Sequence, residues 1–233
     1  MIERVVVTGA SSGIGAACVE AFQGLGAEVL GVDVSDSSRA DDHLQIDLAG
    51  ADCGKRLLEL CGSRTIDGLI NNAGIGLDKA AVDTSAGEFD RVIAVNLRAP
   101  FLLASALYPA LVEARGFVVN VASVHAVATS RFVAAYAASK GGLVAMTRAL
   151  AIEWAPDVRV NAVLPGAVDT EMLRDGLFRT GSSIADLAQR HPLGRLGSPR
   201  EIADAVVFLA TSPFSTGATL TVDGGASARL STE

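Results

Sequence analysis

The chain has 233 residues, of which 50% are hydrophobic, with a formal net charge of -7 and a pI near 5.0. This length and apolar content suffice to bury one large core, so we expect a single domain over residues 1–233. The negative charge argues against a nucleic-acid partner, because binding to a phosphate backbone depends on clustered Lys and Arg.

The N-terminal segment MIERVVVTG carries charged residues before its first apolar run and lacks a secretory signal pattern. No uninterrupted apolar run approaches about 18 residues, so we expect no membrane association and a cytoplasmic protein. The three cysteines, Cys18, Cys53 and Cys61, share no metal-ligand spacing with the histidines. We expect reduced, mostly buried thiols and no metal site.

The first expected element is a buried strand at Arg4–Thr8, which is apolar and β-branched without alternation. The glycine-rich segment GASSGIG follows and opens a helix through AACVEAFQGLG, for which Gly26 suits a C-terminal stop. In this order the glycines let the backbone approach a pyrophosphate, and the first N–H groups of the helix attract that anion. The alternative is a tight connection that binds nothing.

A second strand is expected at Glu28–Val32, followed by Asp33. At about twenty residues past a glycine turn, a carboxylate can accept hydrogen bonds from ribose hydroxyls and repel a 2′-phosphate. Its neighbour Val34 is not basic, so the pattern indicates NAD rather than NADP. The alternative is that Asp33 only caps a turn.

The polar segment between residues 33 and 45 is too short for a full crossover helix, and we expect a loop there. Leu44–Leu48 is expected to form a third strand, with a helix over roughly Cys53–Cys61. A fourth strand at Asp67–Ile70 leads to Asn-Asn-Ala-Gly at 71–74. Small residues there allow close backbone approach, and asparagine amides can brace neighbouring strands.

Residues 85–115 are expected to form one long helical stretch, bent or broken where Pro100 and Pro109 remove backbone donors. Glu88 completes a capping-box pattern with the serine at its start. Asn96 lies in the middle of the stretch, where a buried amide needs hydrogen-bond partners.

Residues 123–140, SVHAVATSRFVAAYAASK, follow a fifth expected strand at Phe117–Ala122. On a helix, Tyr136 and Lys140 project from one face, one turn apart. A neighbouring cation favours the phenolate and lowers the pKa of a tyrosine from its ordinary value near ~10, so Tyr136 can exchange a proton with a substrate hydroxyl. Ser123, at the carboxyl edge of the strand, can hold the substrate oxygen. The alternative is a half-buried tyrosine beside a solvated lysine.

The remaining segments complete the chain. The segment 171–196 is interrupted by glycine and proline and is expected to form a substrate lid. The other expected elements are the continuation of the Tyr136 helix to about Ala155, a strand at Val158–Leu164, a helix from Ser198 to about Thr211 with Pro199 in its first turn, and a last strand at Thr219–Val222.

These motifs together resemble those of the short-chain dehydrogenase/reductase family. Thr8 with its glycine segment is similar to the family's TGxxxGxG, and residues 71–74 match its NNAG. Ser123, Tyr136 and Lys140 match its active-site pattern, and the segment PGAVDT matches PGxxxT. The resemblance implies a single Rossmann-type doubly wound α/β domain, with a mainly parallel seven-stranded sheet and helices on both faces.

The resemblance also implies roles for individual residues. Asn96, Ser123, Tyr136 and Lys140 would be catalytic, with Asn96 kinking its helix and supporting a proton relay, and Lys140 also binding the nicotinamide ribose. Asp47 would contact adenine, and Ser12 occupies a position that is often basic in NADP-binding members. The implied NAD-binding residues are Gly9, Ser11, Ser12, Gly13, Ile14, Asp33, Asp47, Leu48, Asn72, Ala73, Gly74, Tyr136, Lys140, Pro165, Gly166, Val168 and Thr170.

The implied activity is NAD(H)-dependent interconversion of a secondary alcohol and a ketone, with Tyr136 as the acid/base. Alternatives are a 3-hydroxy acid or 3-oxoacyl-thioester substrate, and a regulator that binds dinucleotide without turnover. The expected substrate-binding residues are Ser123, His125 and Tyr136. His125 resembles a carboxylate-binding His of 3-hydroxybutyrate dehydrogenases, although the Gln and Lys of those enzymes are replaced by Gly76 and Val133. The alternative is a His that packs against the lid.

The apolar faces of residues 85–115, 134–155 and 201–209 exceed what one sheet face can cover, so we expect symmetric pairing to bury them. A homotetramer is usual in the family. The other expected partner is the small-molecule substrate.

Overall fold

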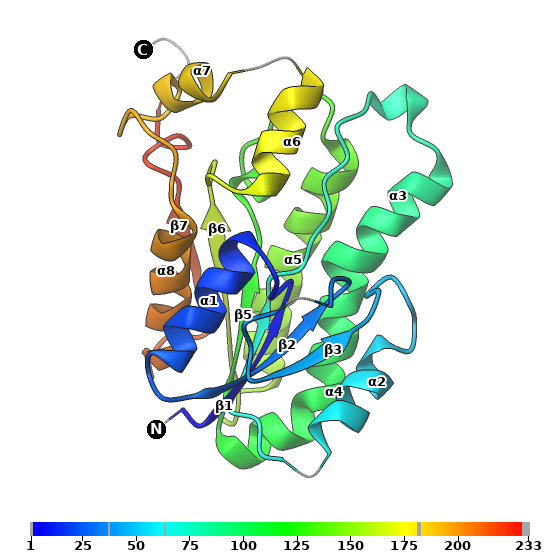
Figure 1. The fold of residues 1–233 in the computed structure, drawn as a ribbon, viewed down its shortest axis with the longest axis vertical. Coiled ribbons are helices and arrows are strands. Elements are labelled where there is room, and N and C mark those ends of the chain that lie inside the picture. Colours follow the sequence, from blue (N-terminus) through cyan, green and yellow to red (C-terminus); the bar gives the residue numbers. More distant parts are fainter. Residues whose placement is uncertain (1, 37, 63, 181–182, 230–233) are drawn as a thin grey trace.

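The computed structural model describes residues 2–36, 38–62, 64–180 and 183–229, which contain one twisted sheet flanked by helices (Figure 1). Seven strands of the described chain run in the order β3-β2-β1-β4-β5-β6-β7, and all neighbouring pairs are parallel. The predicted doubly wound sheet is confirmed. The strands are Arg4–Thr8 (β1), Glu28–Asp33 (β2), Asp42–Gln45 (β3), Gly68–Asn71 (β4), Phe117–Val121 (β5), Arg159–Pro165 (β6) and Thr219–Val222 (β7).

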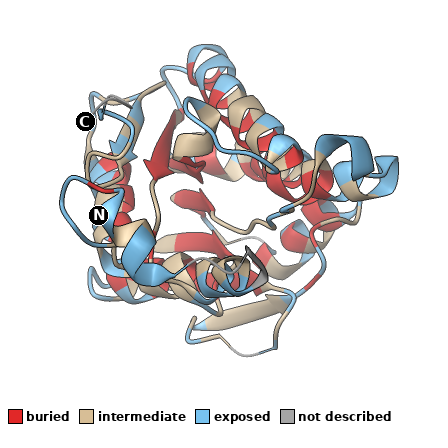
Figure 2. Cartoon of the chain, turned by 90° about the horizontal axis from the view of Figure 1, so that it is seen from above, coloured by how far each residue is buried: buried red, intermediate tan, exposed pale blue. Residues whose placement is uncertain are grey.

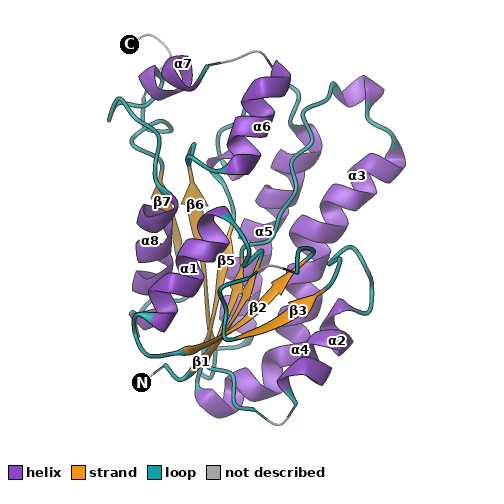
Figure 3. Ribbon diagram, viewed as in Figure 1, coloured by secondary structure: helices purple, strands orange, loops and turns teal. Residues whose placement is uncertain are grey.

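Helices cover both faces of this sheet (Figure 3). On one face α1 packs against α8, and on the other α2 packs against α4 with α5 beside β6. Two more helices, α6 and α7, lie beyond the carboxyl ends of the strands (Figure 1). The helices are Gly13–Gln23 (α1), Cys53–Cys61 (α2), Ala86–Ile93 (α3), Ala99–Ala114 (α4), Ala134–Glu153 (α5), Glu171–Thr180 (α6), Ile184–Gln189 (α7) and Pro199–Thr211 (α8), with short turns at Ala81–Asp83 (η1), Ala94–Arg98 (η2) and Val124–Ala126 (η3).

Each face of the sheet carries its own apolar core. On β1, Val6 packs with Leu103 and Leu107 of α4, whereas Val5 and Val7 belong to the core under α1 and α8. Because side chains alternate across a strand, a strand covered on both faces is apolar throughout. Seen from above, the buried residues lie on the strands and on the inward sides of the helices (Figure 2).

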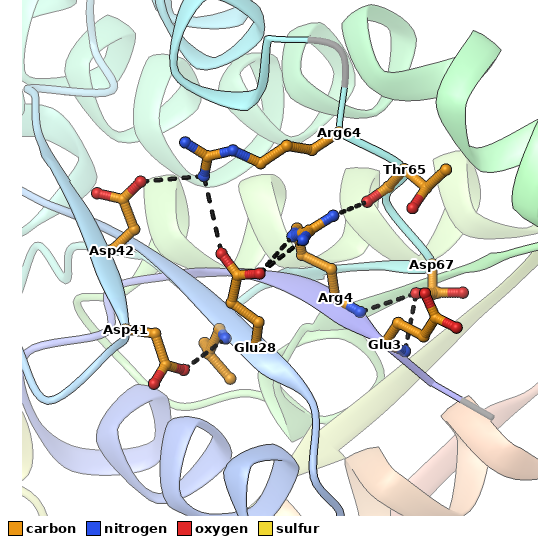
Figure 4. Close-up of polar contacts among 9 residues, drawn as sticks. Glu3, Arg4, Glu28, Asp41, Asp42, Arg64, Thr65 and Asp67 are labelled. Atoms are coloured by element: carbon orange, nitrogen blue, oxygen red, sulfur yellow. Dashed lines mark hydrogen bonds and ion pairs between the residues drawn. The ribbon is translucent and has the colours of Figure 1, made fainter.

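The third strand, predicted at Leu44–Leu48, is present, but its predicted bounds are wrong, because β3 runs from Asp42 to Gln45. Strand β3 pairs with β2 from Asp42 to Gln45, so part of the expected loop is strand. Asp42 is tolerated here because β3 is the outermost strand and because the Asp42 carboxylate lies 3.0 Å from the Arg64 guanidinium (Figure 4). The Glu28 carboxylate also lies near this guanidinium, at 3.8 Å. Edge position and ion pairing thus override the apolar pattern that favoured the later residues.

The charged contacts of Figure 4 join the amino ends of four strands. Arg4 of β1 donates to Glu28 of β2 at 2.8 and 2.6 Å and to the Thr65 carbonyl at 3.0 Å. Asp67 accepts hydrogen bonds from the backbone N–H of Arg4, at 2.8 Å, and of Glu3. This network lies at the edge of the sheet opposite to the motifs described below.

The predicted long helical stretch, expected to be bent or broken at Pro100 and Pro109, is continuous from α3 through η2 to α4, so neither proline breaks it, and Pro109 lies inside α4. The irregularity is a π turn at η2, where the N–H of Ala99 bonds to the carbonyl of Ala94, five residues back. Pro100 follows directly and cannot donate to the carbonyl of Asn96. By length and composition residues 86–114 meet the criteria for a membrane span, and half of the apolar 18-residue window within them is buried in this fold.

The predicted helix start at Ser85 is confirmed, whereas the predicted helix end at Gly26 is not. The capping box at Ser85 and Glu88 is present as predicted. Helix α1 stops at Gln23 rather than at the expected glycine, and Gly26 instead adopts a left-handed φ of 84° in the turn that follows. The three cysteines are free and buried, as predicted.

Candidate active site

The loops after β1, β4, β5 and β6 meet at the carboxyl edge of the sheet, because all these strands are parallel. The strand order reverses between β1 and β4. Ligands of open α/β sheets bind at such a reversal, in the crevice outside the carboxyl ends of the strands. Each predicted motif follows one of these strands, so the fold gathers them at one edge.

The glycine turn after β1 is shaped by close backbone packing. Gly9 has φ of 66° and Gly13 has φ of 53°, values that favour glycine. A Cβ at Gly15 would lie 1.8 Å from the carbonyl oxygen of Gly9, and one at Gly13 would lie 3.2 Å from Thr170. The turn can therefore bring the start of α1 against β1, with Thr170 from the loop after β6 beside it.

The first turn of α1 has no side-chain cap, although Ser12 occupies the N-cap position. The serines that start α3, α7 and α8 all accept such a hydrogen bond. The Ser11 hydroxyl is buried and has no hydrogen-bond partner among the residues that the structure describes. Uncapped N–H groups at the positive end of a helix, beside an orphaned hydroxyl, fit the phosphates of a dinucleotide.

Asp33 ends β2 beside this turn. Its carboxylate accepts hydrogen bonds from the N–H of Ser11 at 3.0 Å and of Ser35 at 3.1 Å. The two predicted roles of Asp33, binding a ribose and capping a turn, are therefore compatible. The carboxylate caps a turn and still has lone pairs for ribose hydroxyls.

Asp47 and Leu48 lie in the loop after β3. Leu48 is buried, and Asp47 accepts from the N–H of Ala49 at 2.9 Å and pairs with Arg91 of α3 at 3.1 Å. These two contacts lower the pKa of Asp47 below its ordinary value, and the hydrogen bond from the Ala49 N–H has the larger effect. Arg91 was missed from the sequence because its partner lies far away in the chain.

The Asn-Asn-Ala-Gly segment braces the sheet, as predicted. Asn71 donates to the Asn120 amide oxygen at 2.8 Å, and Asn120 donates to Thr147 of α5 at 2.9 Å. The Thr8 hydroxyl accepts from the N–H groups of Asn72 and Ala73, both at 3.0 Å. These contacts hold the ends of β1, β4 and β5 at one level.

Asn96 lies in η2 and is completely buried. Its amide accepts from the N–H of Ile75 at 2.8 Å and donates to the Ile75 carbonyl at 2.9 Å and to Ser139 at 3.0 Å. A Cβ at Gly74 would lie 3.4 Å from both the Asn96 amide oxygen and the Lys140 ammonium, so these side chains converge. The side chain has the satisfied amide of a core asparagine and also lies beside Lys140.

Ser123, Tyr136 and Lys140 come together as predicted. Ser123 follows β5 and accepts from the N–H of His125 at 3.2 Å. On α5, the Lys140 ammonium lies 5.7 Å from the centre of the Tyr136 ring and donates to the Val121 carbonyl at 2.8 Å.

The electrostatics of this cluster differ from the prediction. Burial lowers the pKa of Lys140 to about 8. Burial also raises the pKa of Tyr136 above 10.0, and its hydrogen bond with Ser123 acts in the opposite direction. The predicted lowering of the tyrosine pKa is therefore wrong for this structure, because desolvation of the phenolate outweighs the stabilising contacts.

The segment after β6 closes the site from the other side. The N–H of Gly166 bonds to the Val222 carbonyl at 3.0 Å, and Val168 forms a parallel bridge with Gly197. Pro165 is the last residue of β6, and Thr170 reaches Gly13 across the site. Ile14 lies in the first turn of α1. Across the described residues, no group of three His, Cys, Asp or Glu could hold a metal ion.

The fold and this site define a dinucleotide-binding α/β oxidoreductase. The family model described as enoyl-(acyl carrier protein) reductase matches residues 9–227. An uncharacterized short-chain type dehydrogenase/reductase of Sinorhizobium fredii is 41% identical over 95% of this chain, which spans 43% of that relative's length. The chain belongs to the short-chain dehydrogenase/reductase family.

Solved structures agree with this assignment. The ligand-free aldohexose dehydrogenase of Thermoplasma acidophilum has a TM-score of 0.94 at 34% identity, covering 99% of this chain and 96% of that one. A 4-hydroxyisoleucine dehydrogenase complexed with NADH has a TM-score of 0.88 at 30% identity, covering 98% and 100%.

Proposed function

We propose that the protein is an NAD(H)-dependent dehydrogenase that interconverts a secondary alcohol and a ketone. The observation that carries this proposal is the cluster of Ser123, Tyr136 and Lys140 at the carboxyl edge, across from the uncapped start of α1. A screen of secondary alcohols, followed by NADH absorbance, tests it. Failure of every alcohol and ketone with both NAD(H) and NADP(H) would count against it and favour a non-catalytic dinucleotide-binding regulator.

The residues around the glycine turn fit the cofactor. Gly9, Gly13 and the first N–H groups of α1 would hold the pyrophosphate, with Asp33 at the adenosine ribose and Asp47 with Leu48 at the adenine. Bound NAD supplies the acceptor for a hydride from the alcohol carbon. The other predicted contacts are Ser11, Ser12, Ile14, Asn72, Ala73, Gly74, Pro165, Gly166, Val168 and Thr170.

Proton transfer is the task of the protein side chains. Ser123 holds the substrate oxygen, and Tyr136 removes the hydroxyl proton during oxidation or returns it during reduction. Lys140 places a cation beside the developing phenolate. Asn96 holds the loop at Ile75 and supports the proton relay to Lys140. This proton chemistry requires no metal.

A hydroxy acid or an oxoacyl thioester is the second candidate substrate class. A 3-oxoacyl-(acyl-carrier-protein) reductase of Thermotoga maritima, 35% identical over 94% of this chain, favours a thioester, and His125 beside Tyr136 is the residue that favoured a carboxylate. Segment 171–196, which contains α6 and α7 beyond the carboxyl edge, would serve as the lid in either case.

NAD is expected to be preferred over NADP, because the Asp33 carboxylate would repel the 2′-phosphate. This repulsion should lower the affinity for NADP by about ten- to a hundredfold. Asp33→Ala should narrow the ratio of kcat/KM for the two cofactors by about tenfold. Asp36→Ala is the matched control, since Asp36 is exposed in the same loop. Equal kcat/KM for NAD and NADP in the wild type would contradict this prediction.

A homotetramer is expected in solution. Exposed apolar side chains on the outer helices support it: Ile152 of α5 is 82% exposed and Phe208 of α8 is 57% exposed. Ile152→Glu and Phe208→Glu should each yield a smaller species in sedimentation velocity, because a charge in an apolar contact disrupts it. Val82→Glu, on exposed η1, is the control. A stable wild-type monomer at micromolar concentration would refute the expectation.

A further inference from the structure

Ser139 lies on α5 directly before Lys140 and is completely buried. Its hydroxyl donates a hydrogen bond to the Tyr136 carbonyl at 2.7 Å, three positions back in the helix. The same oxygen accepts a hydrogen bond from the Asn96 amide at 3.0 Å. One hydroxyl therefore joins the π turn at η2 to the backbone of the tyrosine proposed to transfer the proton.

This contact completes the hydrogen bonding of the Asn96 amide. The amide oxygen accepts from the N–H of Ile75 at 2.8 Å, and the amide nitrogen donates to the Ile75 carbonyl at 2.9 Å. The nitrogen carries a second N–H, and Ser139 is its acceptor. Because a flipped amide would set donor against donor at Ile75, Asn96 is held in one orientation.

The orientation of this amide matters because its oxygen and the Lys140 ammonium approach the same point. A Cβ at Gly74 would lie 3.4 Å from each of these two atoms. The ammonium is itself held by its hydrogen bond to the Val121 carbonyl, at 2.8 Å. The amide oxygen is the negative end of a dipole, so in this place it favours the charged form of the lysine.

A second buried hydroxyl on α5 has the same bonding pattern at a different place. Thr147 is completely buried, donates to the Leu143 carbonyl at 2.8 Å and accepts from the Asn120 amide at 2.9 Å. It lies about two helical turns beyond Ser139. Both hydroxyls tie α5 to its neighbours, but of the two Ser139 is the one bonded to the backbone of Tyr136.

We propose that Ser139 is a positioning residue for the acid–base step, whose hydroxyl holds the Asn96 amide oxygen toward Lys140 and fixes the backbone that carries Tyr136. This rests on the proposed dehydrogenase function and adds to it a residue that acts through these side chains. Without the hydroxyl, one N–H of Asn96 would lose its acceptor in a fully buried place. That loss is costly and would let the π turn shift relative to α5.

Ser139→Ala removes the hydroxyl and keeps the helix, since alanine has the highest helix propensity. It should lower kcat for oxidation of a secondary alcohol by about tenfold, because small misplacements of reacting groups slow the chemical step. Affinity for NADH, measured by fluorescence titration, should stay within about twofold. Thr147→Val removes the matched hydroxyl and should keep kcat within about twofold. Both variants should lower Tm by about 2–4 °C.

The pH profile of kcat separates positioning from a general loss of stability. The titratable groups of the cluster are Lys140, Tyr136 and His125, whose ring meets the Tyr136 ring edge-on at 5.7 Å. Loss of the amide dipole beside Lys140 favours the neutral lysine, which supports the phenolate less. The increase of kcat with pH should therefore move to higher pH by about 0.5 pH unit in Ser139→Ala. It should stay in place in Thr147→Val.

Two conservative variants test whether the hydroxyl itself is required. Ser139→Thr keeps a hydroxyl, of the kind that Thr147 buries in the same helix, and should restore kcat to within about threefold of the wild type together with the wild-type pH profile. Ser139→Cys keeps a smaller-than-threonine side chain with a weak donor, so its kcat should lie between those of Ser139→Ala and the wild type.

The outcomes distinguish this role from the function on which it rests. Wild-type kcat and an unmoved pH profile in Ser139→Ala would overturn the positioning role and leave the dehydrogenase function standing. Equal losses of kcat in Ser139→Ala and Thr147→Val would overturn it as well, because packing of α5 would then explain both. A wild-type protein that turns over no secondary alcohol or ketone with NAD(H) or NADP(H) would overturn the dehydrogenase function and this proposal together.

Discussion

Tyr136→Phe is expected to lower kcat for alcohol oxidation by about 10³-fold, in the range of general acid–base contributions. The phenol lies one helical turn from Lys140 and is hydrogen-bonded to Ser123, which would bind the substrate oxygen. Removal of one oxygen atom keeps the ring and its packing. NADH affinity, measured by fluorescence titration, should therefore change little while turnover is lost.

The chain contains one other tyrosine, which provides a matched control. Tyr108 of α4 packs against Trp154, with ring centres 4.8 Å apart, away from the carboxyl edge. Tyr108→Phe should leave kcat within about twofold, since surrounding packing is kept and no reacting group is touched. Retention of activity within tenfold by Tyr136→Phe would refute the assignment of the acid/base.

The same assignment predicts a pH dependence. Oxidation requires the deprotonated tyrosine, and burial raises the pKa of Tyr136 above 10.0. The phenolate fraction then grows as pH rises toward that pKa, so kcat for oxidation should increase from pH 7 to pH 9 in the wild type. This rise should be absent from the residual activity of Tyr136→Phe. A profile that falls over this interval would contradict the role.

Gly15→Ala is expected to lower the free energy of unfolding by about 3 kcal/mol or more, at the upper end of overpacking effects. An added Cβ would lie 1.8 Å from the Gly9 carbonyl oxygen and 2.6 Å from the Asn72 amide nitrogen. The first contact is with backbone, so no side-chain rotation relieves it. Helix α1 would have to move away from β1, which would also disturb the glycine turn proposed to bind pyrophosphate.

Gly87→Ala is the matched control for this substitution. Gly87 lies in α3, is exposed, and an added Cβ would meet nothing within 4 Å. Alanine favours helix there, so a gain of about 0.5–1 kcal/mol is expected. Thermal unfolding, followed by circular dichroism, measures the stability of both variants. For a chain of this size, a change of about 1 kcal/mol in the free energy of unfolding shifts Tm by about 2–4 °C. A Gly15→Ala protein as stable as the wild type would contradict the packing argument.

Several site residues could be predicted from the sequence because the patterns that mark them extend over only a few neighbouring residues. A strand, a glycine turn and a helix follow one another within twenty-three residues, and the capping box at Ser85 needs only Glu88, three residues on. Tyr136 and Lys140 share a face through helical spacing alone. Parallel strand order then brings the motifs to one edge, since each motif directly follows a strand.

Other residues depend on partners that are distant in the chain. Arg91 binds Asp47 across 44 positions, and Asn96 reaches Ser139 across 43. No local pattern marks these pairs. The loop after β4 meets the loop after β5 in the same way, through a hydrogen bond from the Lys79 N–H to the Phe132 carbonyl at 2.7 Å.

The sequence alone determined the order of strands and helices, the glycine turn and the tyrosine–lysine spacing, because these follow from side-chain periodicity and backbone chemistry within a few residues. Tertiary structure decided where β3 begins, since pairing with β2 at an exposed edge outweighed the apolar pattern at Leu44–Leu48. It also decided the sign of the Tyr136 pKa shift. Adjacency of a lysine could be deduced from spacing, whereas the extent of burial depends on everything packed around the phenol, and burial outweighed the hydrogen bond with Ser123.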